Sequence, residues 1–119
     1  MLTELGSVIY PTSDLEKDRS LWSVASGAMP YFDTPFYVGF RVGDQEVGLD
    51  PNASSEGVTQ PVAYWLTADL HAAREELIAA GARPVGEVAD VGQGILLARV
   101  ADATGNLIGL MQRSDPEGS

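Results

Sequence analysis

The sequence predicts an α+β domain built from two copies of a βαβββ module. The first observation is an internal repeat, because Tyr10 to Pro30 and Tyr64 to Pro84 share a tyrosine, an aspartate, a glycine and a proline in the same order at near-constant spacing. The second is that each repeat reads as a strand, a capped helix and a glycine stop. The third is that each repeat is followed by a segment with the pattern of a β-hairpin.

Length and composition limit the classes of function. The chain has 119 residues, which fits one domain, 1–119, with a first module at 5–50, a linker at 51–61, a second module at 62–112 and a disordered tail at 113–119. A net charge of −10 argues against nucleic-acid and membrane partners. The absence of cysteine excludes disulfides, thiol catalysis and thiolate metal sites, and together with the absence of a signal-like segment it favours a cytoplasmic location.

The first helix is expected to begin at Ser13 or Asp14. Glu16 lies three residues after Ser13, as in a capping box, and Gly27 suits the left-handed position that ends a helix. Residues at helical spacing predict its apolar stripe: Leu15, Leu21, Trp22 and Ala25.

The second helix is expected to begin near Asp69 and to end at Gly81. Its apolar stripe is predicted from Leu70, Ala73, Leu77 and Ala80. The only histidine of the chain, His71, falls in the first turn of this helix, where a solvated side chain is expected.

Two hairpins follow the helices. Residues 36–50 are expected to turn at Gly43 and Asp44, and residues 94–111 to turn around 103–106, so that Gly48 and Gly109 occupy similar places in the two modules. Segments 28–37 and 51–61 are expected to be irregular. The aromatic residues of the first segment, Tyr31, Phe32 and Phe36, would lie near a rim, either clamping a planar guest or buried in a dimer contact.

The chain resembles the vicinal oxygen chelate superfamily, which includes glyoxalase I, extradiol dioxygenases and bleomycin-resistance proteins. The resemblance rests on the two modules, the "DL" that opens each helix and the "DATGNLIGL" at 102–110, and it covers Leu5 to Gln112. It implies a cupped mixed half-barrel sheet with helices on the outside, a small organic ligand in the cup, and a homodimer.

Catalytic members of that superfamily hold a metal with side chains at four strand positions. Carried over to this sequence, those positions fall on Ser7, Gly48, Val62 and Gly109, none of which supplies a carboxylate or imidazole donor. The resemblance therefore implies a member without a metal or other cofactor. Loss of two glutamates is expected to widen the cup for a bulkier guest, although Gly39 and Gly48 could instead relieve crowding at a bend.

Strand alternation assigns the side chains to faces. Outward positions, expected to pack beneath the helices, are Val38, Phe40, Val47, Leu49, Trp65, Ile108 and Leu110, and Trp22 and Trp65 are expected in the core. Inward positions give the predicted ligand-binding residues: Ile9, Tyr37, Arg41, Glu46, Asp50, Tyr64, Leu66, Arg99, Leu107 and Met111. A cross-strand ion pair is expected between Arg41 and Glu46.

These residues support two main hypotheses. One is a metal-independent binding protein that sequesters or carries a drug-like or aromatic molecule, as in antibiotic resistance, with the acidic charge favouring a cationic guest and a planar apolar guest equally compatible. The alternative is a metal-free isomerase, lyase or hydrolase with Glu46 or Asp50 as the general base. Two weaker readings are a metalloenzyme with relocated ligands at Glu46, Asp50 and Glu56, and a purely structural or regulatory dimer module.

Overall fold

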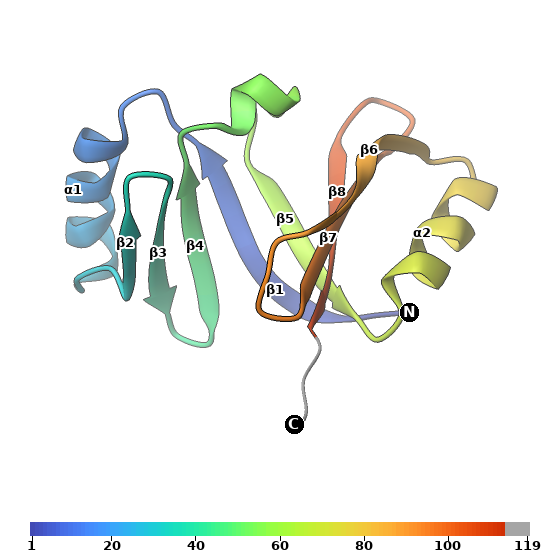
Figure 1. Ribbon diagram of the computed structural model, residues 1–119, viewed down its shortest axis with the longest axis horizontal. Helices are drawn as coiled ribbons and strands as arrows, with labels where there is room; N and C mark the ends of the chain where they lie inside the picture. Colours follow the sequence, from blue (N-terminus) through green and yellow to red (C-terminus); the bar gives the residue numbers. More distant parts are fainter. Residues whose placement is uncertain (114–119) are drawn as a thin grey trace. The chain divides into compact units, whose positions relative to one another are not determined.

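Two series of strand, helix and three strands follow one another along the chain, as expected. The computed structural model describes residues 1–113. The disordered tail was expected at 113–119, but Arg113 is the last residue of a strand, and residues 114–119 lie outside the described ones. The elements are β1 (Leu2–Pro11), α1 (Leu15–Ser26), β2 (Phe32–Thr34), β3 (Tyr37–Val42), β4 (Gln45–Asp50), the short 3-10 helix η1 (Ala53–Glu56), β5 (Val62–Thr67), α2 (Leu70–Ala79), β6 (Arg83–Asp90), β7 (Ile95–Ala101) and β8 (Leu107–Arg113) (Figure 1). The α+β class is confirmed.

The strands form a mixed sheet with the hydrogen-bonded order β2-β3-β4-β1-β5-β8-β7-β6. β1 runs parallel to β4 and β5 runs parallel to β8, while the remaining ladders within each module are antiparallel. The chain divides into two compact units. The first unit is Ser7–Val62, and the second unit combines Met1–Gly6 with the chain from Ala63 onward.

The hairpin of the first unit has the predicted register. β3 and β4 are joined at Gly43, whose φ of 63° is the left-handed conformation that such a tight turn requires. Arg41 therefore lies opposite Glu46, and Gly39 opposite Gly48. This register sends alternate side chains toward α1 and leaves the others on the opposite face, which we call the open face of the unit.

Helix α1 is capped by Asp14, whose side chain accepts a hydrogen bond from the Lys17 N–H, so the alternative start at Ser13 was wrong. The left-handed stop at Gly27 is confirmed, with a φ of 72°. The predicted stripe was partly wrong, because Leu21 is 63% exposed and Ala25 is also exposed. Successive helical residues turn by about 100°, so Leu15 and Trp22 share the face that meets the sheet while Leu21 points away.

The core of the first unit lies between α1 and the sheet (Figure 1). Its fully buried members are the expected Val38, Phe40 and Leu49. Burying an apolar side chain of this size contributes about 1.5–3 kcal/mol, so this cluster holds the helix against β3 and β4. The partly buried residues around it are Tyr10, Leu15, Trp22 and Val47.

The core of the second unit lies beneath α2. Asp69 caps this helix as expected, accepting a hydrogen bond from the Ala72 N–H, and Leu110 is fully buried beneath it. Trp65 was expected in the core but is 36% exposed. The reason is that α2 packs mainly on β7 and β8, which leaves the outer face of β5 incompletely covered.

The two segments expected to be irregular contain regular structure. Residues 32–34 form β2, the edge strand beside β3, because Phe32 pairs with Gly39. Residues 53–56 form η1, anchored by buried Ala53 and Val58, and the Val58 N–H donates to the Ala53 carbonyl. Within residues 1–113, no helix is both long enough and apolar enough to cross a bilayer.

Candidate functional site

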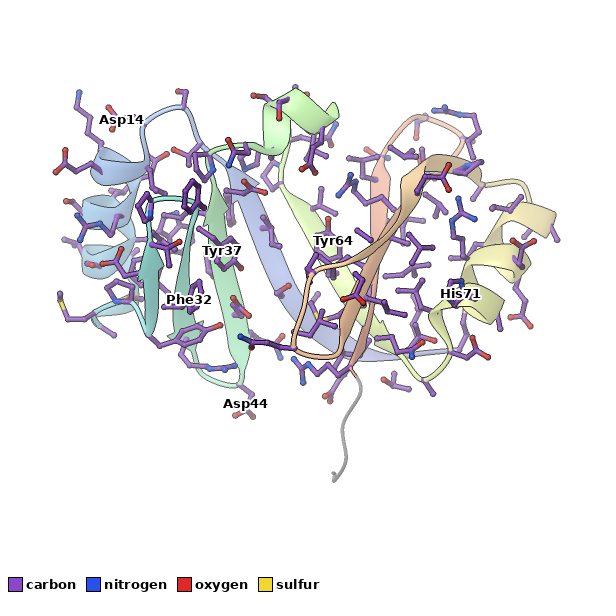
Figure 2. The ribbon with its side chains drawn as sticks, in the orientation of Figure 1. Asp14, Phe32, Tyr37, Asp44, Tyr64 and His71 are labelled. Carbon is purple, nitrogen blue, oxygen red and sulfur yellow. The ribbon has the colours of Figure 1, made fainter. Side chains whose placement is uncertain are left out.

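The four positions that would carry metal ligands lie on β1, β4, β5 and β8. Ser7 pairs with Glu46, and its buried hydroxyl has no hydrogen-bond partner among residues 1–113. Over the same residues, no group of three or more histidine, cysteine, aspartate or glutamate side chains is placed to hold a metal ion. His71 lies on α2, exposed (Figure 2). The donor chemistry of these four positions does not fit a divalent metal.

A tyrosine ring occupies the space above Gly48. A Cβ built on Gly48 would overlap the Tyr37 hydroxyl and would lie 2.5 Å from Tyr37 Cζ. Real Cβ contacts are essentially never this short, so the phenol of Tyr37 fills the volume that a side chain at position 48 would need. The neighbouring Gly39 serves a similar purpose, because its Cβ would lie 3.0 Å from both Tyr31 Cε1 and Glu46 Oε2.

The same arrangement recurs in the second unit. Tyr64 lies directly opposite Gly109 in the parallel ladder of β5 and β8 and is only 3% exposed. A Cβ on Gly109 would lie 2.5 Å from Tyr64 Cδ1 and 2.8 Å from the Ala63 carbonyl oxygen. The glycine in the last strand therefore makes room for an aromatic ring of its neighbour.

The expected widening of the cup at Gly48 and Gly109 is wrong. The volume left by the missing side chains is filled by Tyr37 and Tyr64 rather than left for a guest. Relief of crowding is the correct reading of Gly39 and Gly48. A signal for this was present in the sequence, since an aromatic residue that covers a cross-strand glycine is a recurring way to stabilise a strand that contains one.

Tyr37 and Glu46 form a hydrogen-bonded pair on the open face of the first unit. The Tyr37 hydroxyl donates to Glu46 Oε2 at 2.7 Å. Burial of the phenol raises the pKa of Tyr37 far above its ordinary value, and the adjacent Glu46 charge and hydrogen bond raise it further. Tyr37 is therefore a neutral donor throughout the physiological range, and Glu46 is the acceptor.

The predicted ion pair between Arg41 and Glu46 is not formed. Although the two residues face each other across the hairpin, no ion pair joins them in the part of the chain that the structure describes. Glu46 is instead engaged by Tyr37, while the Arg41 guanidinium lies over the Tyr31 ring, 4.8 Å from its centroid. A cation above an aromatic face is an attractive arrangement of about 0.5–1 kcal/mol at an exposed site.

Ile9 and Asp50 are the other predicted ligand-binding residues of the first unit, and they have different surroundings. Ile9 lies opposite Gly48 on the open face, partly buried. The Asp50 carboxylate accepts a hydrogen bond from the Asn52 N–H at 2.8 Å and so supports the turn that follows β4. Among the two proposed bases, Glu46 alone belongs to the hydrogen-bonded pair with Tyr37.

In the second unit, the face of the sheet opposite α2, which we call its open face, carries an arginine beside apolar side chains. Arg99, half-buried and opposite Gly109, donates from Nη1 to the Tyr64 hydroxyl at 3.1 Å. Leu66 and Met111 pair across the ladder, and both approach Gly6, since a Cβ there would lie 3.3 Å from Leu66 Cγ and 3.4 Å from Met111 Sδ. Leu107 pairs with Ala101 at the start of β8.

Solved structures identify the fold. A methylmalonyl-CoA epimerase in complex with methylmalonyl-CoA and NH4+ matches with a TM-score of 0.74 and 15% identity over 100% of both chains. Methylmalonyl-CoA epimerase from Mycobacterium tuberculosis matches with a TM-score of 0.72 and 20% identity, over 94% of this chain and 89% of its own. Both are members of the vicinal oxygen chelate superfamily.

The chain has the vicinal oxygen chelate fold. The Mn(II)-bound glyoxalase from Novosphingobium aromaticivorans shares the fold with a TM-score of 0.68 and 18% identity, over 93% of this chain and 39% of that longer one. At the level of sequence, no family model and no curated protein matches. At these identities the likeness establishes the vicinal oxygen chelate fold and leaves the activity to the residues themselves.

Two further aromatic residues belong to the candidate site. Tyr31 and Phe32 have ring centroids 6.4 Å apart, and Phe32 and Tyr37 have centroids 6.1 Å apart, with the planes tilted in both pairs. The sequence placed Tyr31 and Phe32 only at a rim. Their position beside Glu46 depends on β2, whose pairing with β3 was not predicted.

We predict that the cost of adding a methyl group at Gly48 depends on Tyr37. Gly48→Ala forces the Tyr37 ring out of its place and should destabilise the chain by about 2 kcal/mol or more. In a Tyr37→Ala background the same change should cost much less, which urea unfolding of the four variants measures as a coupling free energy. Equal costs in both backgrounds would contradict the packing. Gly109→Ala should be relieved only in part by Tyr64→Ala, because the Ala63 carbonyl also opposes it.

We predict that the Tyr37 phenol makes stability fall at alkaline pH. Its pKa is raised in the folded chain, so the stability that it contributes is fully present below the unfolded value of 10.0 and is lost as the pH rises above it. The free energy of unfolding between about pH 10 and 11 should therefore fall less steeply in Tyr37→Phe than in the wild type. Tyr10→Phe is the matched control, and equal slopes in the wild type and Tyr37→Phe would contradict the prediction.

Proposed function

We propose that the chain is a small-molecule-binding protein that works without a divalent metal at the fold's four ligand positions. The observation that carries this proposal is the pair of tyrosine rings that fill the space above Gly48 and Gly109. A coordinated ion at these places would need both donors and room, and Tyr37 and Tyr64 take the room. Binding would then depend on shape, stacking and ordinary polar contacts.

The two open faces offer contacts that suit organic ligands. The first unit presents aromatic rings beside the Glu46 carboxylate and the Arg41 guanidinium. In the second unit, Tyr64 and Met111 are only 3% and 6% exposed, so a ligand would meet the half-buried Arg99 and the partly buried Leu66. A mainly apolar surface with a few placed polar groups is the usual make-up of a small-molecule site. The proposed ligand is a drug-like or aromatic molecule, and sequestration of such a compound is one route to antibiotic resistance.

A metal-free enzyme is a second candidate, favoured by the pair of Tyr37 and Glu46. The phenol fixes one carboxylate oxygen, and a carboxylate accepts more than one hydrogen bond, so Glu46 retains acceptor capacity for a substrate. As a general base it would take a proton from a carbon beside a carbonyl group and return it, as an isomerase requires. Solved structures that share the fold are named as an epimerase and a glyoxalase.

Thermal-shift screening of aromatic metabolites and drug-like compounds, with and without EDTA, tests the main proposal. A ligand at about 100 times its Kd should stabilise the folded chain by about 2.7 kcal/mol, whether or not the chelator is present. Glu46→Gln or Arg99→Gln should abolish the shift, according to which face holds the compound. Glu87→Gln and Arg83→Gln, on exposed β6, are the matched controls. Stabilisation that requires added Mn²⁺ or Ni²⁺, or none across the library, would overturn the proposal.

The same screen separates binding from catalysis. Each stabilising compound is recovered after incubation and compared with the starting material by mass spectrometry and chiral chromatography. Unchanged compound supports the binding protein. A product formed by the wild type and not by Glu46→Gln would show that the enzyme is the correct assignment.

A further inference from the structure

We propose that the open face of the first unit is a binding site for an alkylated ammonium cation, a group such as the trimethylammonium of choline. The site consists of the Tyr31, Phe32 and Tyr37 rings with the Glu46 carboxylate, and we call it the aromatic cluster. The inference rests on the proposed small-molecule function, because it names the ligand class of one of the two faces.

The rings of the aromatic cluster are tilted relative to one another rather than stacked flat. Adjacent centroids lie 6.4 and 6.1 Å apart, with interplanar angles of 49° between Tyr31 and Phe32 and 57° between Phe32 and Tyr37. Tyr31 and Phe32 are 51% and 44% exposed, so a guest can reach both residues from solvent. Tilted aromatic faces present negative charge density from several directions, which suits a rounded cation.

The glycines beneath the cluster allow this arrangement. Any side chain at Gly39 would press on Tyr31 Cε1 at 3.0 Å, and any side chain at Gly48 would displace Tyr37. The rings can therefore lie directly on the backbone of β3 and β4. Glycine at positions 39 and 48 is therefore required for the three aromatic rings to pack beside the Glu46 carboxylate.

The charge of the cluster selects a cation. Glu46 provides a carboxylate, and Tyr37 is a neutral donor that stabilises this carboxylate without cancelling its charge. A net charge of −10 attracts cations from solution toward the whole chain. An alkylated ammonium suits these surroundings better than a bare ammonium, because it is weakly hydrated and the aromatic carbon walls offer it contact rather than hydrogen bonds.

One ring of the cluster, that of Tyr31, already lies against a cation. The exposed guanidinium of Arg41 lies 4.8 Å from the Tyr31 centroid, on a ring face that a guest would also use. The guest must therefore compete with Arg41. Removing this guanidinium should therefore strengthen the binding of a cationic guest, because the Tyr31 ring is then available to the guest alone.

The test compares choline with 3,3-dimethylbutan-1-ol, a neutral molecule of nearly the same shape. Both are titrated into the full chain, and Kd is obtained from the NMR shifts of the Tyr31, Phe32 and Tyr37 ring protons. Choline should bind at least about fivefold more tightly than the alcohol, and its affinity should fall as salt is raised. Equal affinity of the two compounds, or no shift of these rings with choline, would overturn the proposal.

Variants locate the site. Arg41→Gln should tighten choline binding about two- to fivefold, and Tyr31→Leu and Glu46→Gln should each weaken it about three- to tenfold. Arg83→Gln and Glu87→Gln, on exposed β6 and remote in sequence from the cluster, should leave Kd unchanged. If Arg41→Gln weakened binding, competition for the ring would be refuted. Near-ultraviolet circular dichroism verifies that each variant keeps its fold.

The outcomes also distinguish this inference from the broader proposal. A library compound that stabilises the chain in EDTA while choline leaves the cluster unshifted overturns the ammonium site and leaves small-molecule binding in place. A requirement for added Mn²⁺ or Ni²⁺ overturns the broader proposal instead.

Discussion

The steric fit between a tyrosine ring and a facing glycine is the constraint on which both open faces depend. Tyr37 occupies the space above Gly48, and Tyr64 occupies the space above Gly109. The two fits differ in register. Tyr64 lies directly opposite Gly109 in a parallel ladder, whereas Tyr37 lies two residues before the residue opposite Gly48 in an antiparallel one. In both cases an aromatic ring occupies a position that the family resemblance assigns to a metal ligand.

The position of Tyr37 determines the electrostatics of the first unit. Because the ring lies over Gly48, its hydroxyl reaches Glu46. Glu46 forms no ion pair with Arg41 among the described residues, and the Arg41 guanidinium lies over the Tyr31 ring instead. The open face therefore carries a carboxylate and a guanidinium that are separate rather than paired. Separated charges beside aromatic surface are available to a ligand, which is why the arrangement favours binding chemistry over a simple structural role.

The sequence predicted the architecture well because its signals are local. A capping aspartate, a left-handed glycine and strand alternation act over a few residues, so both helices and the register of Gly39 with Gly48 could be derived. The candidate site could not be derived in the same way. Whether Glu46 meets Arg41 or Tyr37 depends on side-chain conformation and on β2, and the exposure of Trp65 depends on where α2 packs.

The proposed function depends on the claim that tyrosine rings fill the space above Gly48 and Gly109 and leave no room for a metal ion. A crystal of the chain soaked in Mn²⁺ and measured at the manganese absorption edge tests it directly. The account predicts tyrosine rings over Gly48 and Gly109 and no anomalous scattering at Ser7, Gly48, Val62 or Gly109. A manganese ion bound at those positions, with Tyr37 or Tyr64 displaced, would contradict it.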